Sequence, residues 1–171
     1  MTRKDVESNP KLLEADKKYD RFIWGMREKA GTDLEPGIRV PSGTKDSDSW
    51  VFWGINKNDR MAGQVTDKAY LGFDNPYMSL TPERLQSFLR VLRDAGYNGG
   101  MKVAGDLGRA TFLSDQIVLH GNTKADAQLA MKLGKQFFKN DLTFSEMGQD
   151  TAAGSYSQNL AAKIEEALRG R

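Results

Sequence analysis

The sequence predicts an α+β fold in which a small, mostly antiparallel sheet packs against helices. Three segments space their apolar residues as helices with one buried face do, namely residues 11–29, 81–96 and 123–137. Four short apolar runs have the length of strands, namely residues 50–55, 68–73, 101–104 and 116–120. Helices and pairs of strands follow one another along the chain, and this order favours one sheet with helices against it.

The chain has the size and composition of a single domain. Its 171 residues are 39% hydrophobic and 28% charged, which suffices for one buried core. We expect two parts within this domain. Residues 1–49 are predicted to hold an N-terminal helix and a mobile loop, and residues 50–171 the α+β core.

The helix at residues 11–29 begins after Asn9-Pro10 and ends before Gly31, which are usual start and stop signals. Residues 31–49 are rich in Gly, Pro, Ser, Thr and Asp, and this composition predicts a long loop. We expect the strands at residues 50–55 and 68–73 to pair as a hairpin.

Two later helices carry clear start signals. Thr81-Pro82 is an N-cap followed by proline, and Thr123 with Asp126 forms a capping box. The faces expected to be buried are Leu85, Phe88, Leu89 and Leu92 in the first helix, and Leu129, Ala130, Leu133 and Phe137 in the second. Residues 140–156 are predicted to be a polar tail, and residues 157–168 a last helix.

Charge and composition exclude several classes of function. The 25 basic and 23 acidic residues leave a net charge of +2, so we expect neither nucleic acid nor a membrane as a partner. The chain has no cysteine and one histidine, His120, which excludes disulfides, iron–sulfur clusters and a thiol nucleophile. No apolar stretch follows Arg3 and Lys4 as in a cleaved signal peptide, so the default location is the cytoplasm.

Three basic residues, Lys68, Lys102 and Arg109, lie on or beside the predicted strands. Such lysines usually point to the solvent side of a half-covered sheet. The alternative is a concave face lined with cations, which would bind an anion such as phosphate. Desolvation and like-charged neighbours favour a neutral amine, so a clustered lysine could also abstract a proton.

His120 and Tyr70 are the candidate proton donors. His120 ends a strand, where it would either satisfy a local hydrogen bond or donate a proton or contact a phosphate. Tyr70 shares a face with Lys68 because side chains alternate along a strand; there it would pack or act as an acid. The Gly105–Arg109 segment lacks the spacing of a phosphate-binding loop.

The order of motifs from residue 50 to residue 159 resembles that of a known family. The matching features are the aromatic strand Trp50-Val-Phe-Trp53, the strand at residues 68–73, the helix opened by Thr81-Pro82, Lys102-Val103, Ser114-Asp115-Gln116-Ile-Val-Leu119 with His120 in place of tyrosine, and Gly154-Ser-Tyr-Ser157. In this order the chain resembles the HopA family domain of type III secreted effectors, which also occurs in lanthipeptide-type biosynthesis and is related in fold to phosphothreonine lyases.

This resemblance implies a carbon–oxygen lyase that eliminates phosphate from phosphothreonine or phosphoserine in a protein or precursor peptide, with no metal or cofactor. Lys102 would be the base, and Tyr70 stands where the lyases use a histidine acid. Lys68, Arg109 and His120 would line the phosphate pocket, with His120 also a candidate catalytic group.

A non-catalytic effector or adaptor is the alternative reading. It would bind a host protein or a leader peptide through the same cationic pocket. In either case the resemblance implies secretion into a host cell, through a specialised system that needs no cleaved signal peptide.

Overall fold

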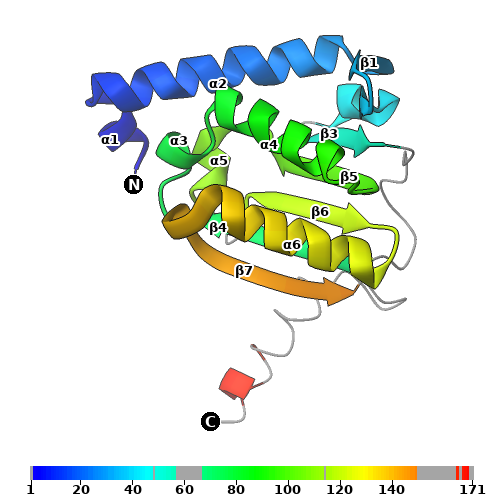
Figure 1. Ribbon diagram of the computed structural model, residues 1–171. Coiled ribbons are helices and arrows are strands. Elements are labelled where there is room, and N and C mark those ends of the chain that lie inside the picture. Colours follow the sequence, from blue (N-terminus) through cyan, green and yellow to red (C-terminus); the bar gives the residue numbers. More distant parts are fainter. Residues whose placement is uncertain are drawn as a thin grey trace.

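The computed structural model describes residues 2–47, 49–56, 67–113 and 115–149, together with residues 165 and 167–169. Within these ranges the chain forms a seven-stranded sheet whose neighbouring strands are all antiparallel (Figure 1). The strands are β1 (Thr32–Glu35), β2 (Ile38–Val40), β3 (Trp50–Ile55), β4 (Asp67–Phe73), β5 (Gly99–Ala104), β6 (Ile117–Gly121) and β7 (Leu142–Gln149). Their order across the sheet is β1-β2-β3-β5-β6-β4-β7. The predicted α+β fold with an antiparallel sheet is confirmed.

The long helices of the described chain lie against one face of this sheet (Figure 1). They are α2 (Pro10–Glu28), α4 (Pro82–Asp94) and α6 (Lys124–Phe138). The shorter helical elements are α1 (Arg3–Glu7), α3 (Pro76–Ser79), α5 (Leu107–Ala110) and the 3₁₀ turns η1 (Ser42–Asp46) and η2 (Lys139–Asp141). No helix among the described residues is long and apolar enough to cross a lipid bilayer.

The predicted start signals are confirmed. The Asn9 side chain accepts hydrogen bonds from the first backbone N–H groups of α2, and Thr81 accepts one from Arg84. Thr123 and Asp126 cap each other reciprocally at the start of α6. These contacts satisfy N–H groups that have no partner inside the helix.

The buried face of α4 is the predicted one, but that of α6 is rotated. Leu129, Leu133 and Phe137 are only half-buried, whereas Gly134 and Phe138 face the sheet. Gly134 explains this rotation, because a Cβ atom at that position would lie 2.8 Å from Leu71 Cδ1. The missing side chain lets the helix approach β4 closely.

The prediction of a loop at residues 31–49 is wrong. This segment contains the β1–β2 hairpin, and two of its glycines lie at the ends of short strands: Gly31 and Gly37 have φ of 84° and 81°. Ile38 and Val40 are buried, and Ile38 pairs with Ile55 of β3. Residues on both sides of position 49 therefore belong to one sheet and one core.

Two further predictions need correction. Strands β3 and β4 do not form a hairpin, because β3 pairs with β2 and β5, and β4 pairs with β6 and β7. The predicted polar tail at residues 140–156 contains the edge strand β7. Residues 150–156, and most of the helix predicted at residues 157–168, lie outside the described residues.

Candidate functional site

The two faces of the sheet differ in chemistry. The side chains that face the helices, such as Ala69, Leu71 and Leu119, belong to the apolar core. The opposite face carries Lys68 and Tyr70 from β4, Lys102 from β5, His120 from β6 and Glu146 from β7, as the strand register shows. We call these five residues the polar face. Four of the five predicted site residues are thus on one side of one sheet.

Lys68 and His120 are direct cross-strand partners. Side chains so placed have Cβ atoms about 4.5–5.5 Å apart. Both residues are buried, with 7% and 6% of their surface exposed. Their outer neighbours in this row are Gly148 on β7 and Gly100 on β5, and the row continues through Gly54 of β3 to Arg39 of β2.

The next row along the strands contains Tyr70 and Lys102. Both pair with Val118 of β6, from its two sides, and Tyr70 pairs with Glu146 on its other flank. Lys102 is thereby a diagonal neighbour of His120, at a Cβ separation of about 7–8 Å. Tyr70 is 3% exposed. The row brings a phenol, a carboxylate and an amine close to the Lys68–His120 pair.

The Lys102 ammonium lies over an aromatic ring. Its Nζ is 4.3 Å from the ring centroid of Trp50, which is on β3 and diagonal to Lys102 in the register. A cation over the face of an indole is attracted by the ring quadrupole. The tryptophan therefore positions this amine.

Arg109 lies outside the sheet, on α5. Its Nη1 donates a hydrogen bond to Ser49 Oγ at 2.7 Å, and the residue is exposed. Because Ser49 precedes Trp50, Arg109 is placed beyond the Trp50 end of the polar face and not beside the Lys68–His120 pair. Its predicted contact with the same phosphate stays a prediction.

Gln116, which the sequence did not single out, fixes the connection between α5 and β6. Its side chain is buried; its Oε1 accepts from the Phe73 N–H at 2.7 Å, and its Nε2 lies within hydrogen-bond distance of three backbone carbonyls, of Phe73, Ala110 and Leu113. Glu146 was missed because β7 was not recognised as a strand. The weak alternation of apolar and polar residues along β7 was the signal that could have identified this strand.

Among the described residues, no group of three or more His, Asp or Glu side chains is arranged to hold a metal ion. The polar face itself carries amines, an imidazole, a phenol and a carboxylate. Amines and an imidazolium bind phosphate oxygens through charge-assisted hydrogen bonds, and each of these groups can also transfer a proton.

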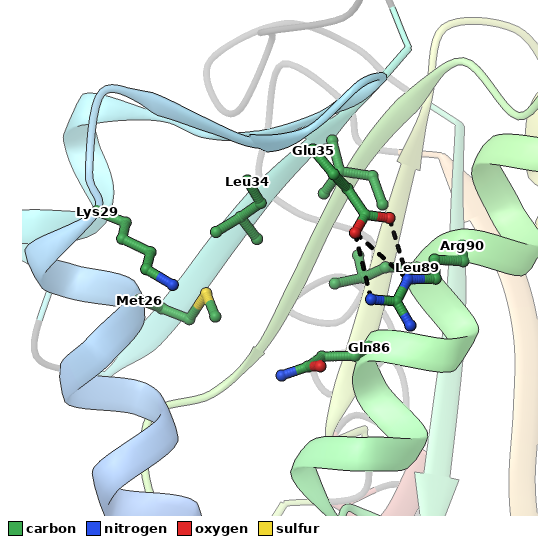
Figure 2. Close-up of a pocket in the computed structure, with 8 residues that line it drawn as sticks. Met26, Lys29, Leu34, Glu35, Gln86, Leu89 and Arg90 are labelled. Carbon is green, nitrogen blue, oxygen red and sulfur yellow. Dashed lines mark hydrogen bonds and ion pairs between the residues drawn. The ribbon is translucent and has the colours of Figure 1, made fainter.

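A separate cavity of about 140 Å³ lies between α2, β1 and α4 (Figure 2). Met26 and Leu34 line it, and Glu35 accepts hydrogen bonds from Arg90 Nε at 3.1 Å and from Arg93 Nη1 at 2.6 Å. The hydrogen bond from Arg90, together with the charges of both arginines, lowers the pKa of Glu35. These contacts hold the β1–β2 hairpin against α4, and the cavity lies at this junction.

Comparisons with known proteins give a match in structure alone. No protein-family model and no curated protein matches the sequence. The structure is similar to the effector protein from Pseudomonas syringae pv. tomato strain DC3000, with 16% identity and a TM-score of 0.46 over 74% of this chain and 53% of that one. It is also similar to the effector protein from Pseudomonas syringae pv. syringae strain 61, with 14% identity and a TM-score of 0.47 over 72% of this chain and 51% of that one. The chain thus spans about half the length of the effector proteins whose structures it resembles.

Proposed function

We propose that the polar face binds the phosphate of a phosphothreonine or phosphoserine in a protein or precursor peptide and eliminates it. One observation supports this most directly: Lys68 and His120 are buried cross-strand partners, and Lys102 and Tyr70 lie in the adjacent row of the same face. A dianionic phosphate needs several donors that converge, and burial strengthens each charge-assisted hydrogen bond by lowering the local dielectric constant.

In the proposed reaction, Lys102 acts as the base and removes the Cα proton of the phosphorylated residue. The electron pair of that C–H bond forms the Cα–Cβ double bond, and the Cβ–O bond breaks. Phosphate leaves with the electron pair of the Cβ–O bond and takes a proton from Tyr70 or His120. Lys68 stabilises the charge that develops on the phosphate oxygens. The products are a dehydroamino acid and inorganic phosphate.

The resemblance to the HopA family domain extends this proposal to a biological role. The motifs that carry the resemblance follow the same order along the chain, although Gly154–Ser157 lies outside the described residues. An effector of this kind would act on a host protein after delivery through a specialised secretion system.

The Lys102–Trp50 contact favours a second candidate, a non-catalytic effector or adaptor that binds a host protein or leader peptide. A base must be neutral when it takes up a proton, whereas the face of Trp50 attracts the charged ammonium form. In this alternative Lys102 stays an ammonium group and contributes to the recognition of an anion.

Incubation with a phosphothreonine peptide, followed by mass spectrometry, tests the proposal. Elimination removes the elements of phosphoric acid, and Lys102→Ala should abolish it. Lys68→Ala should lower kcat, because it removes a charge that stabilises the developing negative charge on the phosphate. The matched control is Lys132→Ala, which replaces an exposed lysine on α6. This variant should leave the rate of elimination unchanged. Binding of the phosphopeptide without a change of mass would refute the lyase and support the adaptor. Neither binding nor elimination would refute both.

A further inference from the structure

A second cavity lies at the end of the molecule where α1, α2, α3 and α5 come together (Figure 1). Its volume of about 550 Å³ is within the range of about 300–1,000 Å³ that is typical of ligand sites. It lies on the helix side of the sheet, whereas the polar face is on the other side. The residues that line it include three aspartates, two apolar residues of the N-terminal helices and an exposed phenylalanine, namely Asp16, Asp20, Asp106, Val6, Leu13 and Phe112.

Asp16 and Asp20 lie one turn apart on α2, so their carboxylates repel each other. Within the described part of the chain, neither carboxylate has a hydrogen bond or an ion pair at its side chain. Burial, and then the charge of Asp106, raises the pKa of Asp16; burial, and then the charges of Asp16 and Asp106, raises that of Asp20. The fold thus keeps three negative groups close together at a cost in free energy.

Two basic residues offset part of this repulsion. The charge of Arg3 lowers the pKa of Asp16 and that of Arg27 lowers the pKa of Asp20, but burial outweighs them and both values stay raised. Arg3 lines the cavity, but its Nε donates to Glu7 at 2.8 Å. Asp106 uses one oxygen to cap α5, which leaves its second oxygen for another donor. The carboxylates therefore have unused capacity to accept hydrogen bonds.

Tyr77 of α3 provides an independent observation. Its side chain is 4% exposed and lines the same cavity, and among the described residues its hydroxyl has no hydrogen-bond partner. Burial, and then the charges of Asp16, Asp106 and Asp20, raises the pKa of Tyr77. The hydroxyl is open to the cavity and not enclosed by the protein, so a donor or acceptor from outside the chain can reach it.

We propose that this cavity binds the arginine side chain of a partner polypeptide. The guanidinium carries five N–H donors in a planar fork, which suits carboxylates from two elements and a phenolic oxygen. Its aliphatic stem would lie against Val6 and Leu13. Phe112, 85% exposed at the cavity, offers the apolar contact that distinguishes a polypeptide from a small free cation, because exposed large apolar side chains are common where proteins associate.

Isothermal titration calorimetry with a short, terminally blocked peptide that contains one arginine tests this proposal. A peptide with citrulline in place of arginine keeps the shape and removes the charge, and agmatine supplies the guanidinium without the peptide. We expect the arginine peptide to bind at least about tenfold more tightly than either, because the citrulline peptide lacks the charge-assisted hydrogen bonds and agmatine lacks the apolar contacts of a peptide. If the citrulline peptide binds as tightly as the arginine peptide, the cavity does not recognise the charge. If agmatine binds as tightly, the assignment to a polypeptide partner is overturned.

Variants locate the binding. Asp20→Asn and Tyr77→Phe should each weaken the arginine peptide about tenfold, whereas Glu28→Gln, which removes an exposed carboxylate from the other end of α2, should leave binding unchanged. Asp20→Asn is expected to fold at least as stably as the parent, so a loss of affinity cannot be attributed to unfolding. If Glu28→Gln weakens the peptide as much as Asp20→Asn does, the peptide binds through general charge attraction and the assignment fails.

Discussion

Residues close together in β4 and β6 have opposite surroundings. Leu71 and Leu119 are fully buried beneath the helices, whereas Lys68 and His120 are buried almost as completely on the other side. Burial of an apolar side chain stabilises the fold, but burial of an amine or an imidazole costs free energy unless interactions offset it. The comparison teaches that one strand can contribute apolar side chains to the core on one face and place an amine or an imidazole on the other.

The sharpest test compares neighbouring residues of β6. Leu119→Ala should lower the free energy of unfolding by about 3 kcal/mol, because it leaves a cavity beneath the helices. His120→Ala should cost less than half of that amount, since its side chain does not belong to the apolar core. Chemical denaturation of both variants measures the difference. Equal losses would show that the polar face contributes to stability as the core does.

Gln116, which directly precedes β6, should break the comparison, because it lies on the same side as His120 by alternation but has a structural role. Gln116→Leu removes the side-chain hydrogen bonds to Phe73, Ala110 and Leu113. We expect a loss of about 2 kcal/mol, since unsatisfied buried groups cost about 1–3 kcal/mol each. A melting temperature like that of the parent protein would mean that water replaces these contacts.

The Trp50–Lys102 contact should contribute less to the free energy of unfolding than the Gln116 side chain does. A double-mutant cycle of Trp50→Leu and Lys102→Met is expected to give a coupling energy of about 0.5–1 kcal/mol, as for a partly exposed cation over an aromatic ring. Urea denaturation of the four proteins provides the measurement. A coupling energy of zero would mean that the ring does not hold the amine in solution.

The smallest effect concerns Asp20, whose negative charge is disfavoured by burial and by the nearby charges of Asp16 and Asp106. Its pKa is raised in the folded protein above the value of 3.8, so the folded state binds this proton more tightly and stability falls as the pH rises through that interval. Asp20→Asn should therefore gain about 0.5 kcal/mol at neutral pH, the scale of one repulsive pair on a helix. Thermal melts at pH 3 and pH 7 measure it; a variant less stable than the parent at pH 7 would contradict the expected repulsion.

The sequence was most informative where structure depends on neighbours in the chain. The start of α4 at Thr81-Pro82 and its buried face both follow from local signals. The shared face of Lys68 and Tyr70 follows from alternation along one strand. The hairpin at residues 32–40 was hidden because its turn glycines and prolines, in a short segment, give the composition of a loop.

Pairing between distant segments could not be read in the same way. That His120 lies opposite Lys68 depends on β6 pairing with β4, and the contact of Lys102 with Trp50 depends on β5 pairing with β3. No local propensity specifies which strands become neighbours. The sequence could therefore suggest the candidate residues. It could not show that Arg109 lies beyond the Trp50 end of the polar face.

The strand order has a consequence for how the protein acquires its site. Strands β5 and β6 insert between β3 and β4, so Lys68 meets His120 only after a large loop of chain has closed. Contacts between residues so distant in sequence slow folding, because entropy is lost before the contacts form. During synthesis, the polar face cannot assemble completely until β7 has left the ribosome, and a chain that ends before β6 would expose unpaired strand edges.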